Sequence, residues 1–172
     1  CVGVVGGDVG VAAAALRDVG LSAMRMEVRP ALGGGLVLDD SYNANPSSMR
    51  AGIEVLTKLP GRRWLVMGDM GELGGEARSS HTEIGGFARE RGVERLFATG
   101  PLSVLAVESF GPGASWYPDT ESLAHAVGDQ LAGDVVLLVK GSRSNRLERV
   151  VAALTGDAML ACFESKYAHM LG

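Results

Sequence analysis

The sequence predicts a doubly wound α/β domain whose mainly parallel sheet of five or six strands is covered by helices on both faces. Short apolar runs alternate with segments of helical period over residues 24–156, which is typical of successive β-α-β units. Glycine supplies 25 of the 172 residues, about twice its average usage of about 7%. These glycines separate the apolar runs, as tight turns between strands and helices require.

The first part of this segment contains two strands and a helix. In order, we expect a strand at 24–28, a glycine turn at 33–35, a strand at 36–38 and a helix that begins at Pro46 and ends before Pro60. Proline suits the first helical position, where its missing N–H costs no hydrogen bond. Asn45, immediately before it, suits the helix cap because its side-chain oxygen accepts a backbone N–H.

Four more strands and four more helices follow. The strands are expected at 64–67, 95–99, 115–117 and 135–139. The first of these helices is expected to open with a capping box at 80–83 and to stop at Gly92. The second is expected around 102–110, and the third starts with Thr120 as its cap. The fourth is expected to run from a Ser144 cap to Gly156. Trp64 and Trp116 fall in strands and are predicted to lie in the core.

The two ends of the chain are expected to lie outside this domain. Residues 9–19 form an alanine-rich helical pattern, and the chain begins at Cys1 instead of Met, so we hypothesise that it is a piece of a longer protein. Residues 157–172 place apolar side chains at helical spacing. This pattern predicts a terminal helix docked on the core or, as an alternative, an oligomer contact.

Composition excludes several classes of function. The formal net charge of −4 argues against a surface for duplex nucleic acid. No apolar run approaches the roughly 18 residues of a membrane span, and no signal peptide opens the chain. Two cysteines do not make a disulfide framework. We therefore expect a cytoplasmic protein that does not bind nucleic acid and does not insert into a membrane. We also expect it to be a monomer.

Polar residues follow three of the predicted strands, where the ligand crevice of an open parallel sheet lies. The loop at 40–46 offers a carboxylate and amides beside a helix start, which suits a ribose or a phosphate; the alternative is a set of turn and cap residues. The loop at 140–145 offers cations and a hydroxyl, which suit a phosphate or carboxylate; the alternative is a solvated loop.

The loop at 68–74 is less specific. Asp69 and Glu72 suit a metal or an ammonium group, or serve a loop without a ligand. His81 follows within the next predicted helix, where a surface or cap-supporting role is favoured over a general base. The sequence holds no G-x-x-x-x-G-K-[ST] motif and no metal-ligand cluster. The chain therefore lacks a phosphate-binding loop of its own.

Three motifs in this order, at 40–46, at 66–74 with His81 following, and at 138–143, resemble the C-terminal domain of the Mur ligase family over about residues 20–155. Within that family, the first motif is similar to the branch that adds D-Ala-D-Ala. The resemblance implies a Rossmann-like domain at 23–156 that closes over ATP bound to a separate central domain. It also implies that residues 1–22 are the tail of that central ATPase domain.

The implied activity is an ATP-dependent, ADP-forming acid–amino-acid ligase of peptidoglycan biosynthesis, and thus of cell-wall biogenesis, cell shape and cell division. It adds D-Ala-D-Ala to UDP-MurNAc-tripeptide through an acyl phosphate. The cofactors are ATP and magnesium (Mg²⁺), the latter held mainly by the central domain, so the isolated fragment is expected to be inactive. The alternatives are a stand-alone nucleotide- or anion-binding module and a Mur-superfamily ligase with another amino substrate.

The resemblance also implies roles for individual residues, but no catalytic residue and no metal ligand in this chain. Asp40 would contact the ATP ribose, and Arg25 would reach the triphosphate. The residues that would line the nucleotide and acyl-phosphate side of the cleft are Tyr42, Asn43 and Asn45. The residues that would face the incoming dipeptide are Lys140, Ser142 and Arg143.

Overall fold

The computed structural model describes residues 26–156, which form one six-stranded sheet in the order β1-β2-β6-β3-β4-β5. The strands are β1 (Glu27–Pro30), β2 (Leu36–Asp40), β3 (Arg62–Met67), β4 (Arg95–Thr99), β5 (Ala114–Tyr117) and β6 (Val135–Lys140). The edge strand β1 runs antiparallel to β2, and the other neighbours are parallel. The predicted mainly parallel α/β sheet is confirmed.

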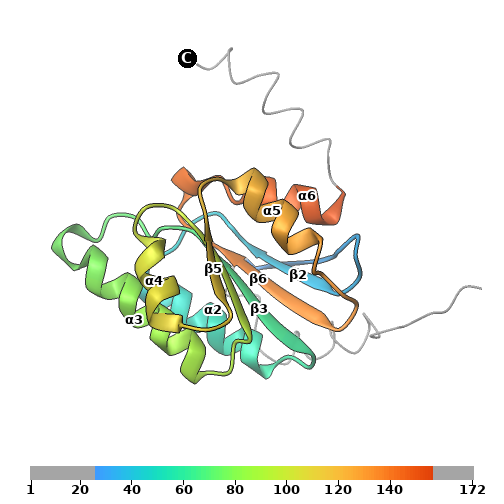
Figure 1. The fold of residues 1–172 in the computed structure, drawn as a ribbon, viewed down its shortest axis with the longest axis horizontal. Coiled ribbons are helices and arrows are strands. Elements are labelled where there is room, and N and C mark those ends of the chain that lie inside the picture. Colours follow the sequence, from blue (N-terminus) through green and yellow to red (C-terminus); the bar gives the residue numbers. More distant parts are fainter. Residues whose placement is uncertain (1–25, 157–172) are drawn as a thin grey trace, which may run out of the picture.

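Helices cover both faces of the sheet (Figure 1). One face carries α2 (Pro46–Lys58), α3 (Ala77–Glu90) and α4 (Ser103–Phe110). The other carries α5 (Thr120–Gly128) and α6 (Glu148–Thr155). Two short 3₁₀ turns, η2 (Gly74–Glu76) and η3 (Arg143–Asn145), precede α3 and α6. This double layer is what apolar side chains on both sides of a parallel sheet require.

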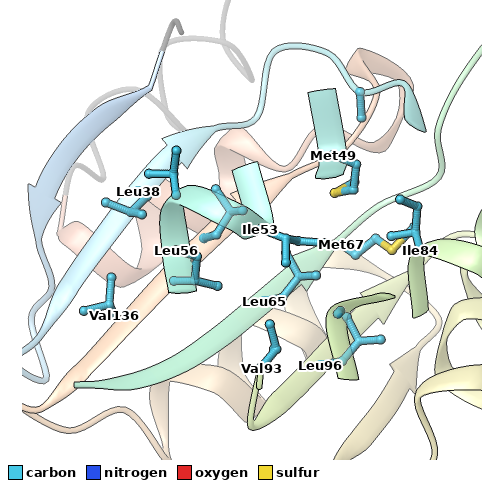
Figure 2. Close-up of a cluster of buried hydrophobic side chains, with 14 of the residues drawn as sticks. Leu38, Met49, Ile53, Leu56, Leu65, Met67, Ile84, Val93, Leu96 and Val136 are labelled. Atoms are coloured by element: carbon cyan, nitrogen blue, oxygen red, sulfur yellow. The ribbon is translucent and has the colours of Figure 1, made fainter. Parts of the chain in front are cut away.

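Each strand divides its side chains between two apolar cores. In β3, Leu65 packs with α2 and α3, whereas Trp64 and Val66 pack with α5 and α6, because successive strand residues point to opposite faces. Figure 2 shows the first core, which includes Leu38, Met49, Ile53, Leu56, Leu65, Met67, Ile84 and Leu96. All six residues of β6 are buried, so this central strand holds the two layers together.

Three predicted helix starts are wrong. The helix α3 begins at Ala77, three residues before the predicted capping box, because η2 already turns the chain into the helix. The cap of α5 is Asp119 instead of Thr120; its carboxylate accepts the N–H of Ser122, and hydrogen bonds from Ser122 lower the pKa of Asp119. The helix α6 begins after η3 without a cap from Ser144.

Other boundaries and burials were predicted with mixed success. Asn45 does cap α2, in a capping box with Ser48. Trp64 lies in the core, but Trp116 is 41% exposed because β5 is an edge strand.

Two segments lie outside the described residues. The first is residues 1–25, which include Arg25 and the predicted helix at 9–19. The second is residues 157–172, where a terminal helix was predicted. Within 26–156, no helix is long and apolar enough to cross a membrane.

Candidate functional site

Three polar loops begin at the same edge of the sheet. The register pairs Asp40, at the end of β2, with Lys140, at the end of β6, and pairs Lys140 with Met67 at the end of β3. The loops at 41–45, 68–74 and 141–145 therefore leave neighbouring strands side by side. This is the carboxyl edge at which open α/β sheets bind ligands.

An ion pair joins the first and third loops. The Nζ of Lys140 donates to Oδ2 of Asp40 at 2.6 Å and to the carbonyl oxygen of Asn43 at 3.0 Å. The side chain of Lys140 is only 2% exposed and that of Asp40 is 11% exposed. The aliphatic part of Lys140 packs against α2, where a Cβ at Gly52 would lie in ordinary contact with its Cδ, at 3.5 Å. Lys140 was predicted to face a substrate. Its side chain instead lies beneath the 41–45 loop, where its ammonium group pairs with the carboxylate of Asp40.

Polar side chains of the 41–45 loop fix their own backbone. Asn43 accepts the N–H of Ala44 at 2.8 Å, and Asn45 accepts the N–H of Ser48 at 2.8 Å. Tyr42 is 56% exposed, and the guanidinium of Arg143 lies 5.3 Å from its ring centre. The predicted nucleotide residue Tyr42 and the predicted substrate residue Arg143 are therefore neighbours at the outer lip of the site.

Asp69 serves the helix that follows the next strand. Its Oδ1 accepts the backbone N–H of Ser103 at 2.8 Å, the hydroxyl of Ser103 at 2.7 Å and the N–H of Leu102 at 3.1 Å. This carboxylate satisfies the free N–H groups at the start of α4. Gly100 allows the approach, since a Cβ there would lie 2.5 Å from Oδ1 of Asp69.

His81 supports the 68–74 loop from below. It lies inside α3 and is fully buried, so the predicted helix-surface position is wrong. Its Nε2 accepts the N–H of Met70 at 3.0 Å, and its Nδ1 lies 2.6 Å from the carbonyl oxygen of Ala77. Because Nε2 is an acceptor, the proton sits on Nδ1 and is donated to Ala77. Nε2 thus holds the 68–74 loop, and Nδ1 bonds the first residue of α3.

The 141–145 loop is bound to the 68–74 loop through Ser142 and Asn145. The N–H of Ser142 donates to the carbonyl of Asp69 at 2.9 Å. The amide of Asn145 accepts the N–H of Asp69 at 3.1 Å and donates to the carbonyl of Asp69 at 2.8 Å. Asn145 was not among the predicted site residues. Gly68 is the residue in the sequence that indicates this contact, because a Cβ there would lie 2.7 Å from Cγ of Asn145.

The predicted substrate residues differ in accessibility. Ser142 is 7% exposed, whereas Arg143 is exposed. No three His, Cys, Asp or Glu side chains within residues 26–156 gather closely enough to hold a metal ion. The residues that this part of the chain brings to the edge therefore offer hydrogen-bond donors, amides and a guanidinium, which suit the oxygens of anionic or hydroxylated ligands.

A cavity of about 610 Å³ lies elsewhere, between α5 and α6. Its lining includes Ala124, Gly128 and Ala153 together with the charged Glu121 and Arg149. None of the predicted site residues within 26–156 lines it. Because the ligand crevice of an open α/β sheet lies at the carboxyl ends of its strands, we place the candidate site at that edge.

The chain matches known proteins over most of its length. Residues 24–143 match the family model described as "Mur ligase, glutamate ligase domain". A relative from Escherichia coli, named UDP-N-acetylmuramoyl-tripeptide--D-alanyl-D-alanine ligase, is 40% identical over 122 residues, which cover 69% of this chain and 26% of the relative. A relative of the same name from Mycobacterium tuberculosis (strain H37Rv) is 36% identical over 173 residues, covering 86% of this chain and 34% of the relative.

Solved structures give the same result. A MurF ligase from Thermotoga maritima in complex with ADP has a TM-score of 0.67 at 28% identity, covering 76% of this chain and 30% of that one. A MurF structure from Acinetobacter baumannii has a TM-score of 0.68 at 28% identity, covering 77% of this chain and 30% of that one. The chain thus spans about a quarter to a third of the length of these relatives.

Proposed function

The chain belongs to the Mur ligase family, and from this premise we propose that it is the C-terminal domain of an ATP-dependent, ADP-forming ligase that adds D-Ala-D-Ala to UDP-MurNAc-tripeptide. The observation that carries the proposal is the meeting of the three motif-bearing loops at one edge of the sheet. The relatives named above act on this tripeptide and this dipeptide according to their names. We propose a monomeric cytoplasmic enzyme of peptidoglycan biosynthesis.

The 41–45 loop is proposed to form the nucleotide side. Lys140 fixes the carboxylate of Asp40 at the strand end, where it would accept hydrogen bonds from the ATP ribose. Tyr42, Asn43 and Asn45 would line the nucleotide and acyl-phosphate side of the cleft. Arg25, outside the described residues, would reach the triphosphate. The complex of the Thermotoga maritima ligase with ADP supports nucleotide binding by this family.

The 141–145 loop is proposed to form the amino-substrate side. Arg143 is exposed at the lip, where its guanidinium would pair with the carboxylate of D-Ala-D-Ala. The hydroxyl of Ser142 would donate a further hydrogen bond. Because Nζ of Lys140 is buried against Asp40 and Asn43, we now give Lys140 an indirect role in this proposal. It would position both loops and compensate the charge of Asp40.

The proposed reaction has two steps. The tripeptide carboxylate attacks the γ-phosphate of ATP to give an acyl phosphate and ADP, and the free amine of the dipeptide then displaces phosphate to form the amide. Magnesium supplies charge neutralisation in the first step, and its ligands would come from the rest of the ligase. The contribution of this domain is to orient both substrates and to exclude water, which lowers the entropic and electrostatic parts of the barrier.

The test is steady-state ADP release by the full-length ligase that carries this chain. We expect release to require both UDP-MurNAc-tripeptide and D-Ala-D-Ala, and the 172-residue chain alone to release none. Asp40→Ala should raise the KM for ATP about tenfold, the effect of losing about one hydrogen bond to a charged group. Asp129→Ala, at a side chain that is 67% exposed on the far side of the domain, is the matched control.

Each other outcome favours a different function. Release that depends on another amine would identify a ligase of the same superfamily with a different amino substrate. Nucleotide binding without ligation would identify a stand-alone binding module. An Asp40→Ala variant whose KM for ATP equals that of Asp129→Ala would remove Asp40 from the ribose.

A further inference from the structure

Asn145 makes more hydrogen bonds than its place in a surface loop requires. Besides its two bonds to the backbone of Asp69, its Nδ2 lies 3.1 Å from the carbonyl oxygen of Ser142 and 2.8 Å from the hydroxyl oxygen of Ser142. The two loops are already joined by backbone bonds, from Ser142 to Asp69 and from Gly68 to Lys140. The bond from Asn145 to the Ser142 hydroxyl is therefore not needed to join the two loops.

This bond limits the directions in which the Ser142 hydroxyl can point its proton. An amide nitrogen only donates, so Oγ of Ser142 accepts from Asn145 with one lone pair. The hydroxyl of Ser144 lies 2.8 Å away and can donate to the second lone pair. Ser144 is exposed, and its hydroxyl can rotate into that role. The single proton of Ser142 is then left for an acceptor outside the loop.

We propose that Asn145 is a positioning residue that holds Ser142 as a hydrogen-bond donor toward the carboxylate of the amino substrate. This inference rests on the proposed function. It assigns to Asn145 the role of keeping the Ser142 hydroxyl as a donor to an acceptor oxygen of the substrate. Gly71 of the neighbouring loop lies beside Ser142, since a Cβ there would be in ordinary contact with Cβ of Ser142 at 3.5 Å and with its Oγ at 3.9 Å. Arg143 follows directly in the chain and would supply the charge that the same carboxylate requires.

Asn145→Asp tests the proposal with almost no change of shape. The introduced carboxylate keeps an oxygen for the N–H of Asp69. It replaces with an acceptor the donor that bonds the hydroxyl of Ser142 and the carbonyls of Ser142 and Asp69. The Ser142 proton then goes to this carboxylate and is lost to the substrate. In the full-length ligase we expect the KM for D-Ala-D-Ala to rise about tenfold, as on loss of one hydrogen bond to a charged group, while the KM for ATP changes by less than about twofold.

Two comparisons separate positioning from a structural role. Ser142→Ala should raise the same KM to a similar extent, and adding Asn145→Asp to Ser142→Ala should raise it no further, because both act through one proton. Gln130→Glu makes the same amide-to-carboxylate change at an exposed residue just after α5 and should leave both KM values unchanged. Melting temperatures of the variants show whether each one is folded.

Three results would overturn the proposal while leaving the ligase function intact. These are equal rises in both KM values for Asn145→Asp, effects of the two substitutions that multiply in the double variant, and a Ser142→Ala enzyme with an unchanged KM for the dipeptide. Failure of the wild-type ligase to use D-Ala-D-Ala would instead remove the proposed function itself.

Discussion

The ammonium group of Lys140 lies almost entirely out of water, where an unpaired charge is very costly. Asp40 at 2.6 Å and the carbonyl of Asn43 at 3.0 Å compensate it. Both partners belong to the segment that leaves β2, so the pair also fixes where that segment starts. The proposed nucleotide side of the site thus depends on a charge that lies beneath it.

Lys140→Met should lower the free energy of unfolding by about 3 kcal/mol, because it leaves the carboxylate of Asp40 partly buried without its counter-charge. Adding Asp40→Asn should recover part of this loss, since the uncompensated charge is then gone. Urea denaturation of the 172-residue chain measures both effects. Lys58→Met, at an exposed lysine at the end of α2, is the control. Equal stability of the Lys140→Met and Lys58→Met variants would show that the ion pair is not needed.

At the scale of residues, the sequence indicates which loops matter but not how their side chains pair. The residue types at 40–46 and 140–145 predict a site at these loops. That Lys140 points to Asp40 depends on a register between strands 100 positions apart in the chain, and the clamp by Asn145 depends on a loop 76 positions away. Such contacts follow from the sheet order, which local patterns do not contain.

At the scale of elements, the helices α3 and α4 approach each other at one glycine. A Cβ on Gly85 would lie 2.1 Å from the carbonyl oxygen of Ala106, whereas a Cβ on the adjacent Gly86 would meet only the Oγ of Ser109 at 3.2 Å. The backbone carbonyl of Ala106 cannot move aside, whereas the side chain of Ser109 can rotate away. The packing of α3 on α4, and with it the position of His81 under the loop, depends on Gly85.

Gly85→Ala should therefore destabilise the domain by about 1–3 kcal/mol, the usual cost of overpacking a close contact, despite the gain of about 1 kcal/mol in helix propensity. Gly86→Ala shares that gain and should leave stability unchanged or higher. Urea denaturation of the two variants measures the difference. A Gly85→Ala chain at least as stable as the Gly86→Ala chain would contradict the close contact.

The periodicity of apolar residues predicted every strand and α-helix within residues 26–156, but not three helix starts. Ser80 and Glu83 have the spacing of a capping box, yet they lie inside α3, because η2 had already begun the helix. Asp119, which precedes the predicted cap Thr120, takes that position instead. Cap patterns are short and occur by chance inside helices, whereas an apolar face extends over several turns.

At the scale of the whole molecule, three polar loops meet at the carboxyl edge of the sheet. The helices cover both sides of the sheet (Figure 1), so the three loops at the carboxyl edge are where we expect a ligand to meet this chain. The sequence holds no phosphate-binding loop, and a single wall of a site binds a ligand weakly because few contacts offset the loss of its freedom. The proposed ligase therefore needs this domain in place beside its ATP-binding part.

A domain exchange tests the central claim most directly. In the Escherichia coli relative, residues 24–156 of this chain would replace the segment to which this chain is similar, and ADP release would be measured with UDP-MurNAc-tripeptide and a panel of amines. We expect release that requires D-Ala-D-Ala and is weakened by Asp40→Ala at limiting ATP. A folded exchange enzyme that binds ATP but releases ADP equally with and without the dipeptide, or only with another amine, would contradict the claim.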